Sequence, residues 1–187
     1  AAAIPYPGEL AMYFLKKGDI QNRKNVLIVG ASGSIGTTAI QLARHFGAKV
    51  TGVCSSRNLE LVKSLGAETV IDYTKEDYSK RSERYDLILD AVPQQVADRK
   101  SLKSQAENVL TPDGKYISID DGIAATSYED LVLLKDLVES GKFKPVIDRS
   151  YSLEQMVEAH RYVETGHKKG NVVITVEHKT YVIRSQT

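Results

Sequence analysis

The sequence predicts an α/β fold with a doubly wound parallel sheet. Up to about residue 120, short apolar runs rich in β-branched residues alternate with helical patterns, which is the order expected of βαβ units. The apolar runs are continuous and do not alternate with polar residues, as is typical of strands whose sheet is covered on both faces.

Each element of this sheet is expected from its own segment. The predicted strands are the apolar runs at 25–30, 49–54, 69–72, 85–90 and 115–120. Helical patterns lie between them at 34–46, 58–65 and roughly 95–109, and one more lies near Glu9–Lys17. Asn58 can cap the helix at 58–65, and Gly66 follows the end of that helix. The segment Thr-Pro-Asp-Gly at 111–114 predicts a turn.

The pattern changes after the fifth predicted strand. Amphipathic helices are expected at 127–142 and 152–166, the second with an apolar stripe at helical spacing made of Leu153, Met156, Val157 and His160. Apolar segments at 143–148 and 171–176 resemble strands that lie outside the parallel sheet. Because uncovered apolar strands recruit other strands, we expect these two segments to pair with each other or with the tail at 180–185, or to drive self-association.

Composition excludes several classes of function. A net charge of +1, from 25 basic and 24 acidic residues, predicts neither a nucleic-acid partner nor an anionic membrane surface. The N-terminal segment has no secretory pattern, so a cytoplasmic protein is predicted. The single cysteine, Cys54, and the spacing of the histidines predict no metal site, and Cys54 is expected to be a buried apolar residue. Asp72 and Asp90 end strands and are expected to shape loops.

A glycine-rich turn follows the first predicted strand. It reads Gly-Ala-Ser-Gly-Ser-Ile-Gly from Gly30 to Gly36 and leads directly into a helical pattern. Glycines in such a turn let the backbone approach a pyrophosphate, which the N–H groups of the helix N-terminus then bind. Ala31, Gly33 and Gly36 align with the three glycine positions of the usual fingerprint. The candidate cofactor-binding residues of the turn are Ala31, Ser32, Gly33, Ser34, Ile35 and Gly36.

The end of the second predicted strand indicates which cofactor binds. An NAD site places an acid there to hold the ribose 2′-hydroxyl. Here the strand is followed by Ser55, Ser56 and Arg57, with no acid before Glu60. Two hydroxyls and a guanidinium suit a 2′-phosphate, so NADP(H) is predicted, with NAD(H) and a merely solvated Arg57 as the alternatives.

Two families of dehydrogenase carry a turn of this kind. Short-chain dehydrogenases usually carry Gly-Ala-Ser-Ser-Gly-Ile-Gly, whereas here glycine stands at 33 and serine at 34, the reverse order. That family also needs a Tyr-x-x-x-Lys pair, and among the ten tyrosines only Tyr13 has a lysine four positions later, Lys17, in a segment that precedes the glycine turn. The chain instead resembles the medium-chain dehydrogenase/reductase superfamily, in its zinc-independent quinone-oxidoreductase-like branch. The resemblance rests on NVLIVGASGSIGTTAIQLARHFGAKV, YDLILDAV, LTPDGKYISI and GKFKPVIDRSYSLEQMVEAHRYVETGHKKGNVVITV, which occur in the family's order.

The resemblance implies a Rossmann-type NADP(H)-binding domain at 1–145. It further implies that 146–187 is a C-terminal segment whose helix and strands pack on a GroES-like catalytic domain, which this sequence does not include. Tyr73 would lie beside the adenine ribose, and Ala91, Val92 and Ser118 near the nicotinamide. The family's glycines are replaced by Asp120 and Asp121 after the fifth strand, and a lysine common in the family is replaced by Asn171.

The resemblance also implies an activity. The intact enzyme would transfer a hydride from NADPH to a quinone or an α,β-unsaturated carbonyl, without zinc and with a homodimer as one possible assembly. No catalytic residue is identified, and the chain alone is expected to bind cofactor weakly and turn over little. The alternative is a non-catalytic nucleotide-sensing or interaction domain.

Overall fold

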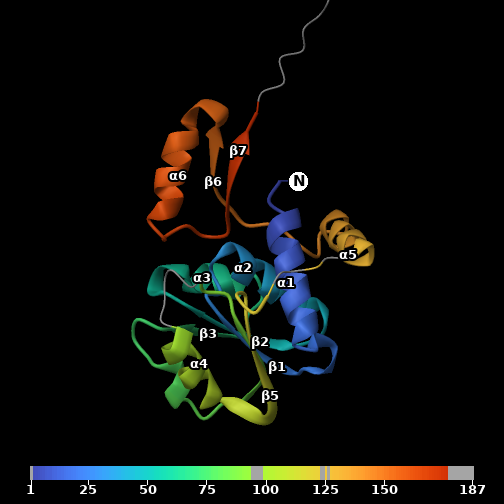
Figure 1. Cartoon of the computed structure of the whole chain (residues 1–187), viewed down its shortest axis with the longest axis vertical. Helices are drawn as coiled ribbons and strands as arrows, with labels where there is room; N and C mark the ends of the chain where they lie inside the picture. Colours follow the sequence, from blue (N-terminus) through green and yellow to red (C-terminus); the bar gives the residue numbers. More distant parts are fainter. Residues whose placement is uncertain (1, 94–98, 123–124, 126, 177–187) are drawn as a thin grey trace, which may run out of the picture.

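The computed structural model describes residues 2–93, 99–122, 125 and 127–176. Its main feature is a parallel sheet in the order β3-β2-β1-β4-β5, which confirms the doubly wound α/β prediction (Figure 1). The strands are β1 Asn25–Val29, β2 Lys49–Cys54, β3 Thr69–Asp72, β4 Tyr85–Asp90 and β5 Leu110–Ser118. The chain moves outward from β1 in one direction and then, from β4, in the other. Ligands of such sheets bind beyond the carboxyl ends of the strands at this switch point.

Helices cover both faces of this sheet. They are α1 Pro5–Lys17, α2 Ser34–His45, α3 Leu59–Ser64, α4 Arg99–Glu107 and α5 Tyr128–Glu139, with short 3-10 helices η1 Ile20–Asn22, η2 Ser56–Asn58 and η3 Tyr78–Lys80. Figure 1 shows α1 and α2 on one side of the sheet and α4 on the other. Val26 and Ile28 of β1 join the apolar cluster of α1, α2, α3 and α5, whereas Leu27 and Val29 join that of α4. The alternation follows because successive side chains of a strand point to opposite faces.

The C-terminal part forms a second, two-stranded sheet. β6 Ile147–Ser152 and β7 Asn171–Thr175 pair in parallel and are linked by η4 Leu153–Gln155 and α6 Met156–Glu164. Tyr151 lies opposite Ile174 in this pairing. The expectation that the two apolar segments pair with each other is confirmed, whereas the tail at 180–185 lies outside the described residues.

Several predicted boundaries were wrong. α1 begins at Pro5, because proline is well tolerated in a first helical turn. The turn expected at 111–114 lies inside β5, where the register against β4 shifts, since an edge strand tolerates such an irregularity. The strand expected at 143–148 starts only at Ile147, because Phe143 is 3% exposed and packs into the core of the large sheet.

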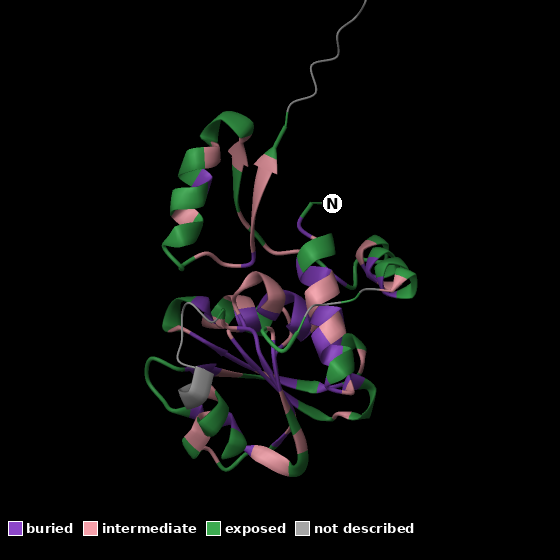
Figure 2. Ribbon diagram, in the orientation of Figure 1, coloured by how far each residue is buried: buried purple, intermediate pink, exposed green. Residues whose placement is uncertain are grey.

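The expected apolar face of the last helix is mostly uncovered. Leu153 and Val157 are 50% and 61% exposed, and His160 is exposed as well. Only Ala159 of α6 is buried among the described residues, as Figure 2 shows by the green and pink surface of that helix. The periodicity was correct for a helix, but the small sheet is too narrow to bury the whole stripe.

Candidate nucleotide-binding site

The glycine turn between β1 and α2 depends on two close backbone approaches. Gly30 has φ +78°, and a Cβ there would lie 3.2 Å from the Ala91 carbonyl. A Cβ on Gly36 would lie 2.2 Å from the Gly30 oxygen. Gly30 is therefore required for the turn, although the fingerprint alignment assigned the first position to Ala31. The signal was present in the sequence as a glycine directly after the strand.

The other residues of the turn fix the start of α2. The N–H of Ala31, whose side chain is fully buried, donates to Val53 O at 3.0 Å. Gly33 is the N-cap residue and Ser34 the first helical residue. The first N–H groups of a helix have no partner within it, so those of Ser34, Ile35 and Gly36 are left without an intrahelical hydrogen bond. This arrangement favours an anion.

A lysine from the C-terminal unit lies against this helix start. Lys168 Nζ donates to Gly170 O at 2.8 Å and to Ser34 Oγ at 3.4 Å. The Gly170 N–H donates to Ser32 O at 2.9 Å. Burial lowers the pKa of Lys168. Sequence reasoning missed Lys168 and noted Asn171, whose side chain binds Val146 O instead.

The predicted adenosine-binding residues gather at the ends of β2 and β3. Cys54 pairs with Asp72 in the register, and the Tyr73 N–H donates to Cys54 O at 3.2 Å. Ser55 and Ser56 therefore lie beside Tyr73, whose side chain is 61% exposed. Arg57 is exposed and makes no hydrogen bond or ion pair with the part of the chain that the structure describes.

An acid also lies in this corner, but it comes from β3. Asp72 Oδ2 accepts from Ser56 Oγ at 2.5 Å, and Oδ1 accepts from Thr74 N at 3.0 Å and Thr74 Oγ1 at 2.6 Å. The hydrogen bonds from Ser56 and Thr74 lower the pKa of Asp72 to about 2. Asp72 shapes its loop as predicted, and it also contacts a predicted cofactor residue.

Asn58 links the two halves of the site. Its Nδ2 donates to Ser32 Oγ at 3.0 Å and to Ser55 Oγ at 3.3 Å. Asn58 stands at the predicted N-cap position of α3, yet its side chain does not cap that helix. Its Oδ1 is buried and has no hydrogen-bond partner among the described residues.

The ends of β4 and β5 hold the remaining candidates. Asp90 is fully buried, and its carboxylate accepts from Val92 N at 3.0 Å and from the Tyr116 hydroxyl at 2.6 Å. Ala91 and Ser118 are also buried, and Ser118 pairs with Asp90. Asp90 therefore shapes the loop that follows β4, as predicted. All the candidate residues of the sequence lie at the carboxyl edge of the large sheet.

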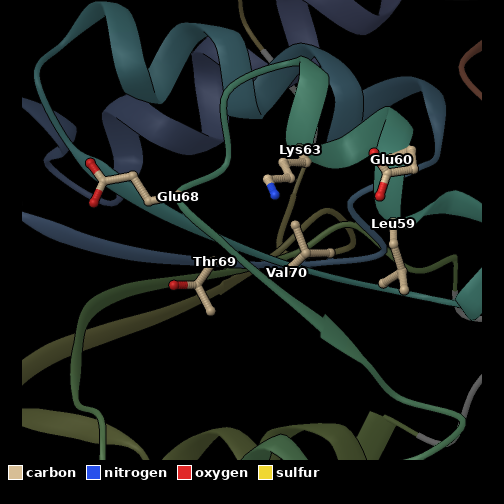
Figure 3. Close-up of a pocket in the computed structure, with 6 residues that line it drawn as sticks. All are labelled: Leu59, Glu60, Lys63, Glu68, Thr69 and Val70. Carbon is tan, nitrogen blue, oxygen red and sulfur yellow. The ribbon is translucent and has the colours of Figure 1, made fainter.

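Two surface hollows among the described residues lie away from this edge. One hollow of about 350 Å³ is lined by Leu59, Glu60, Lys63, Glu68, Thr69 and Val70, between α3 and the start of β3 (Figure 3). A second, of about 340 Å³, is lined by residues that include Asn25, Lys49 and Tyr85, the first residues of β1, β2 and β4. Because cofactors of such sheets bind at the carboxyl edge, neither hollow is assigned to the site.

In the described ranges, no three His, Cys, Asp or Glu side chains come close enough to hold a metal ion. No helix in those ranges is long and apolar enough to cross a membrane. Cys54 is buried, and burial together with the nearby charge of Asp72 raises the pKa of its thiol to about 11.

The families and relatives that match this chain are named as dehydrogenases, reductases or oxidoreductases. Residues 34–127 match a family described as zinc-binding dehydrogenase, and residues 122–174 match a second family with the same description. The chain is 39% identical over 184 residues to 2-methylene-furan-3-one reductase of Solanum lycopersicum, covering 93% of this chain and 46% of that protein. It is 33% identical over 186 residues to the chloroplastic NADPH-dependent alkenal/one oxidoreductase of Arabidopsis thaliana, with the same coverage of 93% and 46%.

The fold matches a solved structure over nearly its whole length. The quinone oxidoreductase from Coxiella burnetii superposes with a TM-score of 0.78 at 28% identity, covering 95% of this chain and 60% of that one. The chain thus spans about half the length of the curated relatives it matches, at 46%.

Proposed function

Because the chain belongs to the zinc-binding dehydrogenase family, in the quinone-oxidoreductase-like branch of the medium-chain dehydrogenase/reductase superfamily, we propose that it is the cofactor-binding part of an NADPH-dependent oxidoreductase. The observation that carries this proposal is the glycine turn at the start of α2 with Lys168 beside it.

The turn fits a pyrophosphate in shape and charge. A side chain at Gly36 would occupy the space of the Gly30 carbonyl, so glycine at this position lets the start of α2 pack closely against the turn. The N–H groups of Ser34 to Gly36 and the Lys168 ammonium supply donors and positive charge. Binding of phosphate would compensate the unfavourable burial that lowers the pKa of Lys168.

The adenosine half would bind beside β2 and β3. We assign the 2′-phosphate to Ser55 and the exposed Arg57, with Ser56 beside them, and the adenine ribose to Tyr73. The name of the Arabidopsis relative, an NADPH-dependent oxidoreductase, supports this choice of cofactor. The nicotinamide would lie near Ala91, Val92 and Ser118. Asp90 fixes this loop by accepting a hydrogen bond from Val92 N.

The names of the relatives support a substrate class. A bound reduced nicotinamide supplies a hydride to an electrophilic carbon or quinone. The relatives are named for alkenal/one, furanone and quinone reduction, which supports a quinone or an α,β-unsaturated carbonyl as the acceptor. We propose that the reaction is zinc-independent, as the resemblance to the quinone-oxidoreductase-like branch implies.

The organisation of the intact protein is likewise a proposal. Residues 1–145 would form the cofactor domain, and 146–187 would pack on a catalytic domain supplied by the rest of a longer protein. The exposed apolar face of α6 supports this division. A homodimer and a cytoplasmic location remain predictions, and the Arabidopsis relative is named as chloroplastic.

Titration with NADPH and NADH, followed by turnover with a quinone and an enone, tests the proposed function. We expect NADPH to bind and its absorbance to fall when either acceptor is added to the full-length protein. A Gly36→Val variant, which fills the turn, should lose binding by about 100-fold, equivalent to roughly 2.8 kcal/mol. Binding without turnover by the full-length protein would favour the sensing alternative, and absence of binding by both nucleotides would overturn the proposal.

A further inference from the structure

The hydroxyl of Ser56 is already used within the protein. Ser56 has one O–H, and it donates to Asp72 Oδ2 at 2.5 Å. The Thr74 hydroxyl donates to Asp72 Oδ1 at 2.6 Å and lies 3.1 Å from Ser56 Oγ. Both hydroxyl protons therefore point at the carboxylate, and Ser56 offers a cofactor its lone pairs. A ribose 2′-hydroxyl can donate to them, whereas a 2′-phosphate carries only acceptor oxygens.

The Asp72 carboxylate is a fixed negative charge at this corner. Its side chain is 8% exposed, and Lys75 Nζ lies 3.5 Å from its Oδ2. The register places Asp72 directly opposite Cys54, the last residue of β2. An acid at the end of β2 is what holds the ribose hydroxyls in NAD sites, and here β3 supplies an acid to the same corner through Ser56.

Arg57 acts in the opposite direction. It is exposed and has no hydrogen bond or ion pair with any residue that the structure describes, so its guanidinium is available to a 2′-phosphate. A phosphate monoester carries close to two negative charges at neutral pH. Arg57 therefore attracts the 2′-phosphate that Asp72 repels.

We propose that Asp72, acting through Ser56, is a specificity-determining residue that weakens the preference of this site for NADPH and lets it accept NADH as well. The proposal rests on the proposed function, because it assumes that a nicotinamide dinucleotide binds at the carboxyl edge of the sheet. Asp72 is a positioning residue here, since it sets the direction of the Ser56 hydroxyl.

Asp72→Asn tests the proposal most directly. The amide oxygen can still accept from Thr74, while the NH₂ group can donate to Ser56 Oγ and so release the Ser56 proton toward the cofactor. We expect the ratio of NADPH to NADH affinity to rise about tenfold, mainly through tighter NADPH. The gain should shrink as salt is raised, because part of it is loss of a charge repulsion. Calorimetric titration of each nucleotide measures both effects.

Two further variants separate this role from a general loss of structure. Ser56→Ala removes the acceptor but keeps Asp72, so NADH affinity should fall about threefold while NADPH changes by less than about twofold. Asp77→Asn is the matched control. Asp77 accepts from Ser79, two residues later, through N at 2.9 Å and Oγ at 2.7 Å, much as Asp72 accepts from Thr74, but Asp77 is the N-cap residue of η3 and makes no hydrogen bond to Ser56. The ratio of NADPH to NADH affinity should stay unchanged in Asp77→Asn.

The outcomes distinguish the two proposals. If the wild-type protein binds neither dinucleotide, the proposed function fails and this inference fails with it. If both bind and Asp72→Asn leaves the ratio unchanged or lowers it, the inference alone is overturned. Should Asp72→Asn not fold, Ser56→Ala decides, and an unchanged NADH affinity in that variant would overturn the inference.

Discussion

The two sheets of this protein are built in opposite ways. Four of the five residues of β1 are buried, and every residue of β4 is buried except one that is half-buried. β6 and β7, in contrast, have no fully buried residue. The large sheet is stabilised by helices on both faces. Among the described residues the small sheet packs against α6, whose apolar face is largely exposed (Figure 2).

Because its own packing is thin, the small sheet depends on contacts with the large unit for its position. Its contacts with the large unit include those at the glycine turn, through Lys168 with Ser34 and Gly170 with Ser32. The proposed phosphate site therefore lies where a well-packed unit meets a thinly packed one. Ligand binding there is expected to order the small sheet more than the large one.

The largest effect on the free energy of unfolding is expected from a substitution in the well-packed large sheet. Leu89→Ala removes a fully buried side chain of β4 and should lower the free energy of unfolding by about 3 kcal/mol. Val157→Ala, the matched change on the 61% exposed face of α6, should cost less than about 0.5 kcal/mol. Urea denaturation of both variants measures the two costs, and similar values would show that the packing contrast is absent in solution.

A smaller effect is expected where the two regions join. Gly170 has φ +50°, and a Cβ there would lie 2.5 Å from Val146 O. Gly170→Ala should therefore weaken the docking of the small sheet by about 2 kcal/mol. Amide exchange should accelerate in β6 and β7 but not in β1 and β4.

Gly166→Ala is the control for that variant. Gly166 has φ +73° with no atom within 4 Å of an added Cβ, so it carries the backbone strain without the clash. Equal acceleration of exchange in both variants would attribute the effect to strain alone.

Next in size is the contribution of Lys168 to phosphate binding. Lys168→Ala should weaken NADPH binding about tenfold, or 1.4 kcal/mol. Burial lowers the pKa of this lysine below its ordinary 10.5, and only the charged form attracts phosphate. Affinity should therefore be highest below that lowered pKa and fall as pH rises through it. This decline of NADPH affinity with pH should disappear in both Lys168→Ala and Lys168→Arg. A parallel decline in the wild type and in both variants would show that another group titrates.

The smallest effect concerns the exposed face of α6. Leu153 is 50% exposed, so Leu153→Ser should leave the free energy of unfolding within about 0.5 kcal/mol. The same change should reduce self-association, because it removes apolar surface that another molecule can cover. Sedimentation velocity over a concentration series compares the variant with the wild type, and identical profiles would exclude this face from any association.

Local patterns were enough to predict the large sheet. Its strands are continuous apolar runs, and burial on both faces is a property of each run by itself. The glycine turn was equally local, since Gly30 to Gly36 lie together in the chain. The last helix shows the limit of such reasoning: its period predicted a helix, but exposure of Val157 depends on how much surface a neighbouring unit offers.

The sequence by itself determined the doubly wound sheet, the phosphate-type turn and the edge at which every candidate residue lies. Only the tertiary structure decided which charges meet there. Asp72 reaches Ser56 from 16 residues away and Lys168 reaches Ser34 from 134 residues away. Such contacts depend on strand order and on the docking of the small sheet, which bring distant parts of the chain together and which no local pattern encodes.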